Sequence, residues 1–160
     1  VKGTWEDGVW QNGAWYGGTW EKGTWKDGNW EGGVWKRGVW EGGVWDYGTW
    51  MDGTWKDGVW DGGDWLKGTW ISGTWEYGKW EGGTWKSGAW KDGTWDGGKW
   101  EDGTWYKGTW KKGTWENGLW KDGKFKGGIW KDGYWNGGEW TKGKDAKGKA
   151  HAKGDSPDKW

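Results

Sequence analysis

The sequence predicts an all-β repeat protein built from very short strands. Residues 1–140 consist of 28 copies of a five-residue unit whose third position is always glycine and whose fifth is always aromatic. Phe125 is the single departure from Trp at the fifth position. A period of five does not match the 3.6-residue period of an α-helix, and a glycine in every unit would cost a helix about 1 kcal/mol each time. A strict, short period also means that the repeat determines the whole architecture.

The residues around each Trp predict a three-residue strand with the indole on its inner face. Position four, just before Trp, is Thr in 12 repeats and Val in five, and β-branched residues favour strands. Position one, just after Trp, is mostly Glu, Lys or Asp, as in Glu6 and Lys26. Because side chains alternate across a strand, Trp points inward while its two neighbours face solvent.

Almost nothing except Trp is available to form a core. The chain has 28 Trp but only one Phe, one Met and no Cys. Burying one Trp removes about 200 Å² of surface, which is worth about 5 kcal/mol, whereas ordering five residues costs about 7 to 8 kcal/mol. We therefore expect fully buried indoles, with backbone pairing and Trp–Trp contacts supplying the remainder. The expected core residues include Trp5, Trp10, Trp15, Trp20, Trp25, Trp30, Trp65, Trp70, Trp115, Trp120, Phe125, Trp130, Trp135 and Trp140.

The favoured architecture is an antiparallel meander of hairpins. Position two, just before glycine, is Asp, Asn or Gly in 18 of 28 repeats, and such pairs favour a type I′ turn with φ > 0 at both positions. In residues 115–120, a turn at Asn117-Gly118 would place Trp115 opposite Trp120. Repetition of this hairpin would join all the indoles into one Trp ladder. The expected turn glycines include Gly8, Gly23, Gly68 and Gly118.

The alternative is a square β-solenoid with four pentads per coil, in which Trp points inward and the glycine two residues earlier is its small inward neighbour. The invariance of glycine separates the two, because a position that needed only a small side chain would accept Ala or Ser. No repeat does so, which indicates a backbone demand for φ > 0 and favours the meander. A flat meander leaves its Trp face bare, so we expect it to coil or to self-associate through the Trp faces.

The pentads resemble several repeat families. Gly23-Thr24-Trp25 is similar to the small–spacer–large unit of pentapeptide-repeat proteins, which form square β-helices. The Gly-x-Trp-x-x-Gly string at 33–38 resembles part of a MORN repeat, which forms hairpin meanders, although the period here is much shorter. The Trp-Glu-Asn-Gly-x-Trp stretch resembles designed tryptophan-zipper hairpins. Long Gly-Thr-Trp arrays also resemble segments of phage and bacterial surface proteins, which implies an extracellular or virion-surface location, for example in a tail fibre.

The repeats place chemically similar side chains at equivalent positions, whereas catalysis needs several different functional groups held close together. The only histidine, His151, lies in a Lys/Gly/Ala stretch where we expect a solvated tail residue. Acidic residues recur without Cys or His at metal-ligand spacing, and Asp61 and Asp64 indicate a solvated face. We therefore predict no enzyme, no cofactor and no metal site.

Charge and hydropathy restrict the partners. The chain carries 24 basic and 24 acidic residues, so we expect no nucleic-acid partner, because phosphate binding needs a clustered basic field. No apolar run is long enough for a membrane-spanning helix, so none is expected.

Residues 141–160 lose the Trp pattern and become rich in Lys and Gly. This segment is predicted to be a flexible tail or a cap that protects the last strand edge.

The leading functional expectation is a structural one. A chain with a Trp core and no reactive cluster suits a stiff repeat module of a fibre, appendage or surface protein. The alternative is a glycan- or choline-binding module that uses exposed Trp, because aromatic faces stack on sugars and attract quaternary ammonium groups. The exposure of the indoles distinguishes the two.

Overall fold

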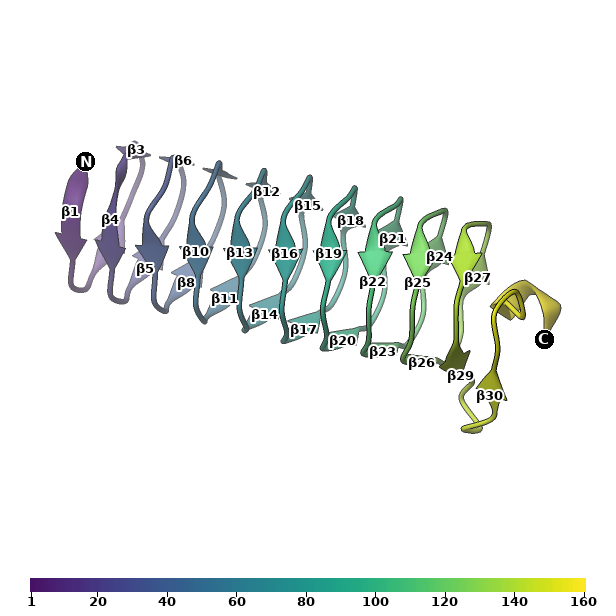
Figure 1. Ribbon diagram of the computed structural model, residues 1–160. Helices are drawn as coiled ribbons and strands as arrows, with labels where there is room; N and C mark the ends of the chain where they lie inside the picture. Colours follow the sequence, from purple (N-terminus) through teal and green to yellow (C-terminus); the bar gives the residue numbers. More distant parts are fainter.

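The computed structural model describes all 160 residues and is a β-solenoid of about ten stacked coils, with the two termini at opposite ends (Figure 1). Each strand pairs in parallel with the strand three pentads further along the chain, so that Trp5 lies beside Trp20 and Trp50 beside Trp65. One coil therefore contains three pentads, each of which forms one side.

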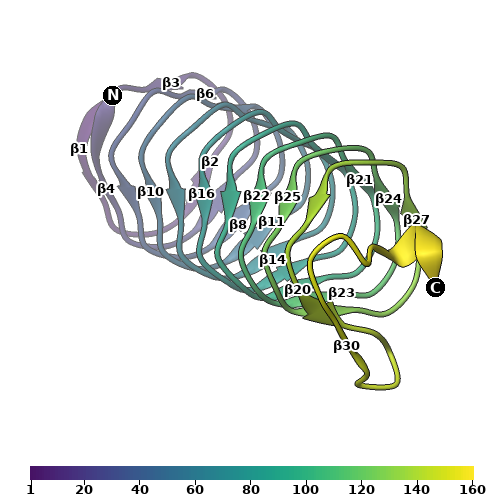
Figure 2. The same ribbon diagram turned by 45° about the vertical axis from the view of Figure 1, so that its right-hand side comes forward.

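Three sheets form the three sides of the coil (Figure 2). The first sheet contains β1 (Lys2–Trp5), β4 (Gly17–Trp20), β7 (Val34–Trp35), β10 (Thr49–Trp50), β13 (Asp64–Trp65), β16 (Lys79–Trp80), β19 (Thr94–Trp95), β22 (Thr109–Trp110), β25 (Lys124–Phe125) and β28 (Glu139–Trp140). The second sheet contains β2 (Val9–Trp10), β5 (Thr24–Trp25), β8 (Val39–Trp40), β11 (Thr54–Trp55), β14 (Thr69–Trp70), β17 (Thr84–Trp85), β20 (Lys99–Trp100), β23 (Thr114–Trp115), β26 (Ile129–Trp130), β29 (Gly143–Lys144) and β30 (Ala150–His151). The third sheet contains β3 (Ala14–Trp15), β6 (Asn29–Trp30), β9 (Val44–Trp45), β12 (Val59–Trp60), β15 (Thr74–Trp75), β18 (Ala89–Trp90), β21 (Thr104–Trp105), β24 (Leu119–Trp120) and β27 (Tyr134–Trp135).

The favoured antiparallel meander is wrong, and the alternative solenoid is right in class but has three sides rather than four. The size of the indole explains the number. Trp35 and Trp40 meet edge to face with ring centroids 6.1 Å apart, and Trp40 meets Trp45 in the same way at 5.9 Å. Trp45 in turn meets Trp50 of the next coil at 5.9 Å, so three indoles per coil close the cross-section, whereas a fourth side would move the rings apart and open the centre.

The indoles form three stacked ladders, one behind each sheet. Trp40 and Trp55, one coil apart, stack with ring centroids 4.8 Å apart and an interplanar angle of 5°. Each buried indole thus combines the offset-stacked and edge-to-face arrangements that aromatic rings prefer. The expected pairing of Trp115 with Trp120 across a hairpin is wrong, because these rings lie on adjacent sides at 74° to one another. Phe125 takes its place in the first ladder.

The hydrophobic core consists of Trp residues and Phe125 alone. Every fifth-position aromatic from Trp15 to Trp130, together with Trp140, is at most 2% exposed. Trp5, Trp10 and Trp135 are only partly buried, because they belong to the terminal coils and lack a neighbouring ring on one side.

Backbone hydrogen bonds in every pentad join each coil to the one before it. The N–H of Thr24 donates to the carbonyl of Gly8, and the N–H of Lys26 donates to the carbonyl of Trp10, both at 2.8 Å. The glycine N–H at the corner has no partner in this ladder, and the side chain just before it supplies one. Asp27 Oδ1, for example, accepts from the N–H of Gly28 at 2.8 Å. This bond explains the preference for Asp and Asn at position two without a hairpin turn.

Position three requires glycine for two reasons that act together. Its φ is positive in every repeat, as the invariance of glycine indicates, and Gly68 has φ = 123°. A Cβ on Gly68 would also clash with the carbonyl oxygen of Gly53 in the preceding coil. The expected second turn position with φ > 0 is absent, because Gly17 is the only position-two residue of the repeats with a positive φ.

We expect Gly68→Ala to lower the free energy of unfolding by at least about 2 kcal/mol, because it combines backbone strain with a clash against the preceding coil. Thr69→Ala in the same repeat should cost about 1 kcal/mol or less, since Thr69 faces outward and is half-buried. Urea unfolding followed by circular dichroism measures both. Equal midpoints for the two variants would contradict this account of position three.

Residues 141–160 fold across the C-terminal end of the coils (Figure 2). Strand β29 continues the second sheet in parallel with β26, and β30 pairs antiparallel with β29. The short 3₁₀-helix η1 (Pro157–Lys159) follows and lies beside β27. Trp160 meets Trp140 edge to face at 5.3 Å, and the N–H of Gly154 donates to the carbonyl of Trp140. The structure contains no helix of the length and apolar character needed to cross a membrane.

Candidate functional site

Residues three pentads apart in the sequence lie above one another on the outer surface, and we call such a set a column. Seven ion pairs join a lysine to an acidic residue one coil earlier in the same column, with N–O distances of 2.9 to 3.6 Å. Each exposed pair contributes at most about 1 kcal/mol. The pairs show nevertheless that neighbours in a column are close enough to interact, and that four columns place opposite charges beside each other.

In another column, four acidic residues follow one another. Glu31, Asp46, Asp61 and Glu76 occupy four consecutive coils at the corner between the third and first sheets. None of the four forms an ion pair within 4 Å. Two carboxylates about 4.8 Å apart in water repel by about 0.9 kcal/mol. This acidic column therefore concentrates negative potential on one corner of the solenoid.

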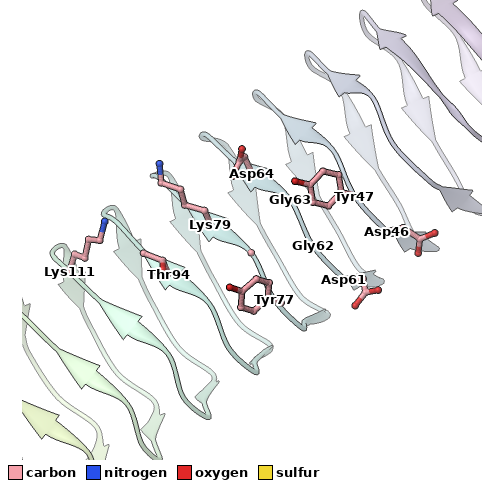
Figure 3. A pocket seen from close by; sticks show the side chains of 11 residues that line it. Asp46, Tyr47, Asp61, Gly62, Gly63, Asp64, Tyr77, Lys79, Thr94 and Lys111 are labelled. Carbon is pink, nitrogen blue, oxygen red and sulfur yellow. The ribbon is translucent and has the colours of Figure 1, made fainter.

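A hollow of about 520 Å³ lies beside the acidic column (Figure 3). Its walls include Tyr47 and Tyr77, which occupy one column two coils apart and are 68% and 63% exposed. Gly62 lies between them in that column and forms a buried part of the floor. Asp46 and Asp61, from the acidic column, border the same hollow.

The lysines that reach the hollow are already paired. Lys79 donates a hydrogen bond to Glu81, and this bond raises the pKa of Lys79 above its usual value. Lys111 lies 3.6 Å from Asp96. Asp64, which lies beside Lys79 in the first sheet, lines the hollow without an ion-pair partner. Asp46 and Asp61 therefore have no ion-pair partner, whereas the charge of Asp64 acts on the neighbouring Lys79 and helps to raise its pKa.

A second cluster holds the C-terminal segment together. His151 Nδ1 lies 2.7 Å from Asp155 Oδ2, and His151 Nε2 lies 3.2 Å from Asp145 Oδ2. Because both ring nitrogens face carboxylate oxygens, both hydrogen bonds form only when the imidazole carries two protons. Trp160 stacks on the imidazole with ring centroids 3.8 Å apart. The expectation that His151 is a solvated tail residue is wrong, since it is 4% exposed.

The geometry of this cluster suits a structural contact. The two carboxylates lie on opposite sides of the imidazole, so their oxygens do not converge on one point, and the structure holds no group of three or more His, Cys, Asp or Glu side chains arranged to hold a metal ion. A hollow of about 450 Å³ adjoins the cluster, and its lining includes Ile129, Gly143 and His151. The ion pairs of His151 thus connect the hairpin of β29 and β30 to the residues that lead into η1.

We expect acidification to loosen residues 141–160 before the coils. The hydrogen bond from His151 holds the pKa of Asp145 and of Asp155 below the usual value. A lowered pKa in the folded state stabilises the segment above the unfolded value near 3.9, and this stabilisation is lost as the pH falls through the folded pKa. Hydrogen exchange followed by mass spectrometry at about pH 6 and about pH 3 measures the change. Uniform loosening of coils and end segment would contradict this expectation.

The structure places the predicted site residues in different roles. The expected core indoles point into the solenoid, and Gly8, Gly23, Gly68 and Gly118 have φ between 114° and 127° at its corners. Asp61 and Asp64 are exposed, as a solvated face requires, but both also line the hollow.

Sequence reasoning missed Tyr47 and Tyr77. The signal was that these two repeats alone have an aromatic residue at position two, and that they are six pentads apart. That spacing has a meaning only when one coil is known to contain three pentads.

Comparisons with known proteins assign no family. No protein-family model matches the chain, and no curated protein matches it. Among solved structures, the chain is compared with the crystal structure of a putative acetyltransferase from Desulfovibrio desulfuricans G20, at 3% identity and a TM-score of 0.14. The match covers 78% of this chain and 31% of that chain. At this TM-score the similarity contributes nothing to the assignment of fold or function.

Proposed function

We propose that this chain is a structural repeat module, a stiff rod within a fibre, appendage or surface protein. The observation that carries the proposal is the continuity of the Trp core. Each indole stacks on the ring one coil away and meets the rings of both adjacent sides, so the core has no break at which the rod could bend. In such arrays each repeat is stabilised by its neighbours.

The burial of the indoles weighs against a module that binds glycans or choline through exposed Trp. Only Trp5, Trp10 and Trp135 in the repeats are accessible in part. The Trp faces are therefore unavailable along the sides of the rod, both for a sugar and for pairing with a second copy of the chain.

Stiffness can be measured with two spin labels, because the chain has no native cysteine. Lys26→Cys and Lys131→Cys place labels in one column seven coils apart, which corresponds to about 34 Å between the labelled backbones. A stiff rod gives one narrow distance distribution near that separation. A broad distribution, or several populations, would contradict the proposal.

The alternative is tested by quenching of Trp fluorescence with acrylamide. A buried core gives weak quenching that a cello-oligosaccharide does not change. Strong quenching that the sugar relieves would favour the glycan-binding module instead.

A further inference from the structure

We propose that the hollow between Tyr47 and Tyr77 binds an organic cation with a weakly hydrated charge, namely a guanidinium or a quaternary ammonium group. This site goes beyond a structural role, and it would let the rod hold a small molecule or the arginine side chain of another protein. Three observations support it: the position of the two tyrosines, the unpaired acidic groups beside them, and a related arrangement elsewhere on the same corner.

The two tyrosines border the hollow from positions two coils apart. Tyr47 and Tyr77 belong to the same column with Gly62 between them (Figure 3). Coils that follow the spacing of paired strands place the two backbones about 9.6 Å apart. A cation bound in the hollow between the two residues has to come within roughly 6 Å of a ring centroid to be attracted to the aromatic face. Gly62 has no side chain, and the Tyr47 ring leans over it, with Cδ2 3.6 Å from the place that a Cβ would take.

The charge around the rings favours a cation. Asp46 and Asp61 belong to the acidic column, and Asp64 faces outward from the first sheet. None of these carboxylates has an ion-pair partner, while Lys79 and Lys111 are bonded to Glu81 and Asp96. The hollow therefore combines two exposed aromatic side chains with three carboxylates that form no ion pair within 4 Å.

The same corner already contains a cation–π arrangement made by the chain itself. Lys91, Tyr106 and Lys121 follow one another in the column that also contains the acidic residues. The two ammonium nitrogens lie 4.1 and 4.2 Å from the centroid of the Tyr106 ring, one coil on either side. Here one ring lies between two cations. At Gly62 the order is inverted, and two rings flank a position that has no side chain.

The chemistry of the ligand follows from these surroundings. Guanidinium is planar and weakly hydrated and stacks on aromatic faces, whereas an ammonium group is a compact and strongly hydrated charge. Quaternary ammonium groups are recognised by aromatic cages in the same way. A neutral sugar would use the rings but would gain nothing from the aspartates. Since the site is open and shallow, we expect dissociation constants on the order of millimolar.

Binding can be followed on the tyrosines, because the chain has only five of them and 28 Trp dominate its fluorescence. In protein with isotope-labelled tyrosine rings, titration with tetramethylammonium chloride should shift the ring signals of Tyr47 and Tyr77 and leave those of Tyr16 and Tyr134 in place. N-acetyl-arginine methylamide and an oligo-arginine peptide form the second and third arms. Equal affinity per cation in all arms indicates a small-molecule site, and markedly tighter binding of the peptide indicates an arginine side chain of a protein partner.

Variants separate cation–π attraction from simple charge attraction. Tyr47→Leu and Tyr77→Leu should each weaken binding about two- to fivefold, and Asp61→Asn should weaken it as well. Gly62→Lys should fill the site from within and abolish the shifts. A Cβ at Gly62 would meet only ordinary contacts of 3.5 and 3.6 Å, so this variant is expected to fold.

Gly42→Lys is the matched control. Gly42 also occupies position two, is flanked in its column by Asp27 and Asp57, and has no tyrosine beside it. Binding of tetramethylammonium should be unchanged in this variant.

Three results would overturn the proposal. One is equal shifts of all tyrosines, which indicates an effect of salt alone. Another is binding of tert-butanol or a cello-oligosaccharide as strong as that of tetramethylammonium, which indicates a neutral aromatic platform. The third is unchanged binding in the two Tyr→Leu variants, with the fold intact by circular dichroism.

Discussion

Deletion of residues 81–95 is expected to leave a folded solenoid that is one coil shorter, whereas deletion of Glu81 alone should destabilise the chain severely. Residues 81–95 make up one full coil, so removing them brings Trp80 and Trp100 into the places of consecutive indoles and every later column keeps its register. Removing one residue shortens a corner and turns every later residue of the strand to the opposite face, which exposes the indoles.

A deletion of residues 81–85 tests whether the coil or the pentad is the smallest exchangeable unit. Every pentad presents the same Trp and Gly, so the core survives this deletion and only the columns outside change partners. We expect a small loss of stability from mismatched surface charges, of about 1 kcal/mol or less. Thermal unfolding by circular dichroism ranks the three deletions. If deletion of Glu81 lowered the thermal stability no more than deletion of residues 81–95, the core would not depend on the register of the repeats.

Trp75→Ala is expected to cost about 4 to 5 kcal/mol, at the upper end for loss of a large buried aromatic side chain. Trp75 is fully buried, stacks on Trp60 and Trp90, and meets Trp70 and Trp80 edge to face. Its removal leaves a cavity in a core that has no flexible side chain to fill it. Chemical denaturation gives the free energy of unfolding directly.

Trp75→Phe is the matched control and should cost much less than Trp75→Ala. Phe125 shows that a phenyl ring fits the ladder, with centroid distances of 5.7 Å to Trp110 and 4.3 Å to Trp140. The indole N–H of Trp75 has no hydrogen-bond partner, so its loss removes no bond. Trp5→Ala, in the first coil and partly buried, should also be mild. Comparable losses at Trp5 and Trp75 would contradict the role of the stacked neighbours.

The hairpin prediction failed because one local pattern has two physical explanations. Asp or Asn before an invariant glycine is typical of a type I′ turn, and the glycine does have a positive φ. In the solenoid, Asp27 accepts a hydrogen bond from the N–H of Gly28, and the missing Cβ of a glycine such as Gly68 makes room for the carbonyl of the coil below. The carbonyl that occupies the space at Gly68 belongs to Gly53, three pentads earlier in the chain. The residues of a single pentad therefore give no indication of this contact.

The sequence by itself determined that this protein is an all-β repeat with a Trp core, because a period of five excludes a helix and no other residue type could supply the buried surface. The tertiary structure decided the number of pentads per coil, because this number depends on the distance between the indoles across the coil. Three indoles in edge-to-face contact set three pentads per coil, and that number alone decides which residues share a column. It places Tyr47 beside Gly62 and Tyr77, and it aligns Asp46 with Asp61. His151 and its partners lie outside the repeat, so the role of this residue was also decided only by the tertiary structure, through its contacts with Asp145, Asp155 and Trp160.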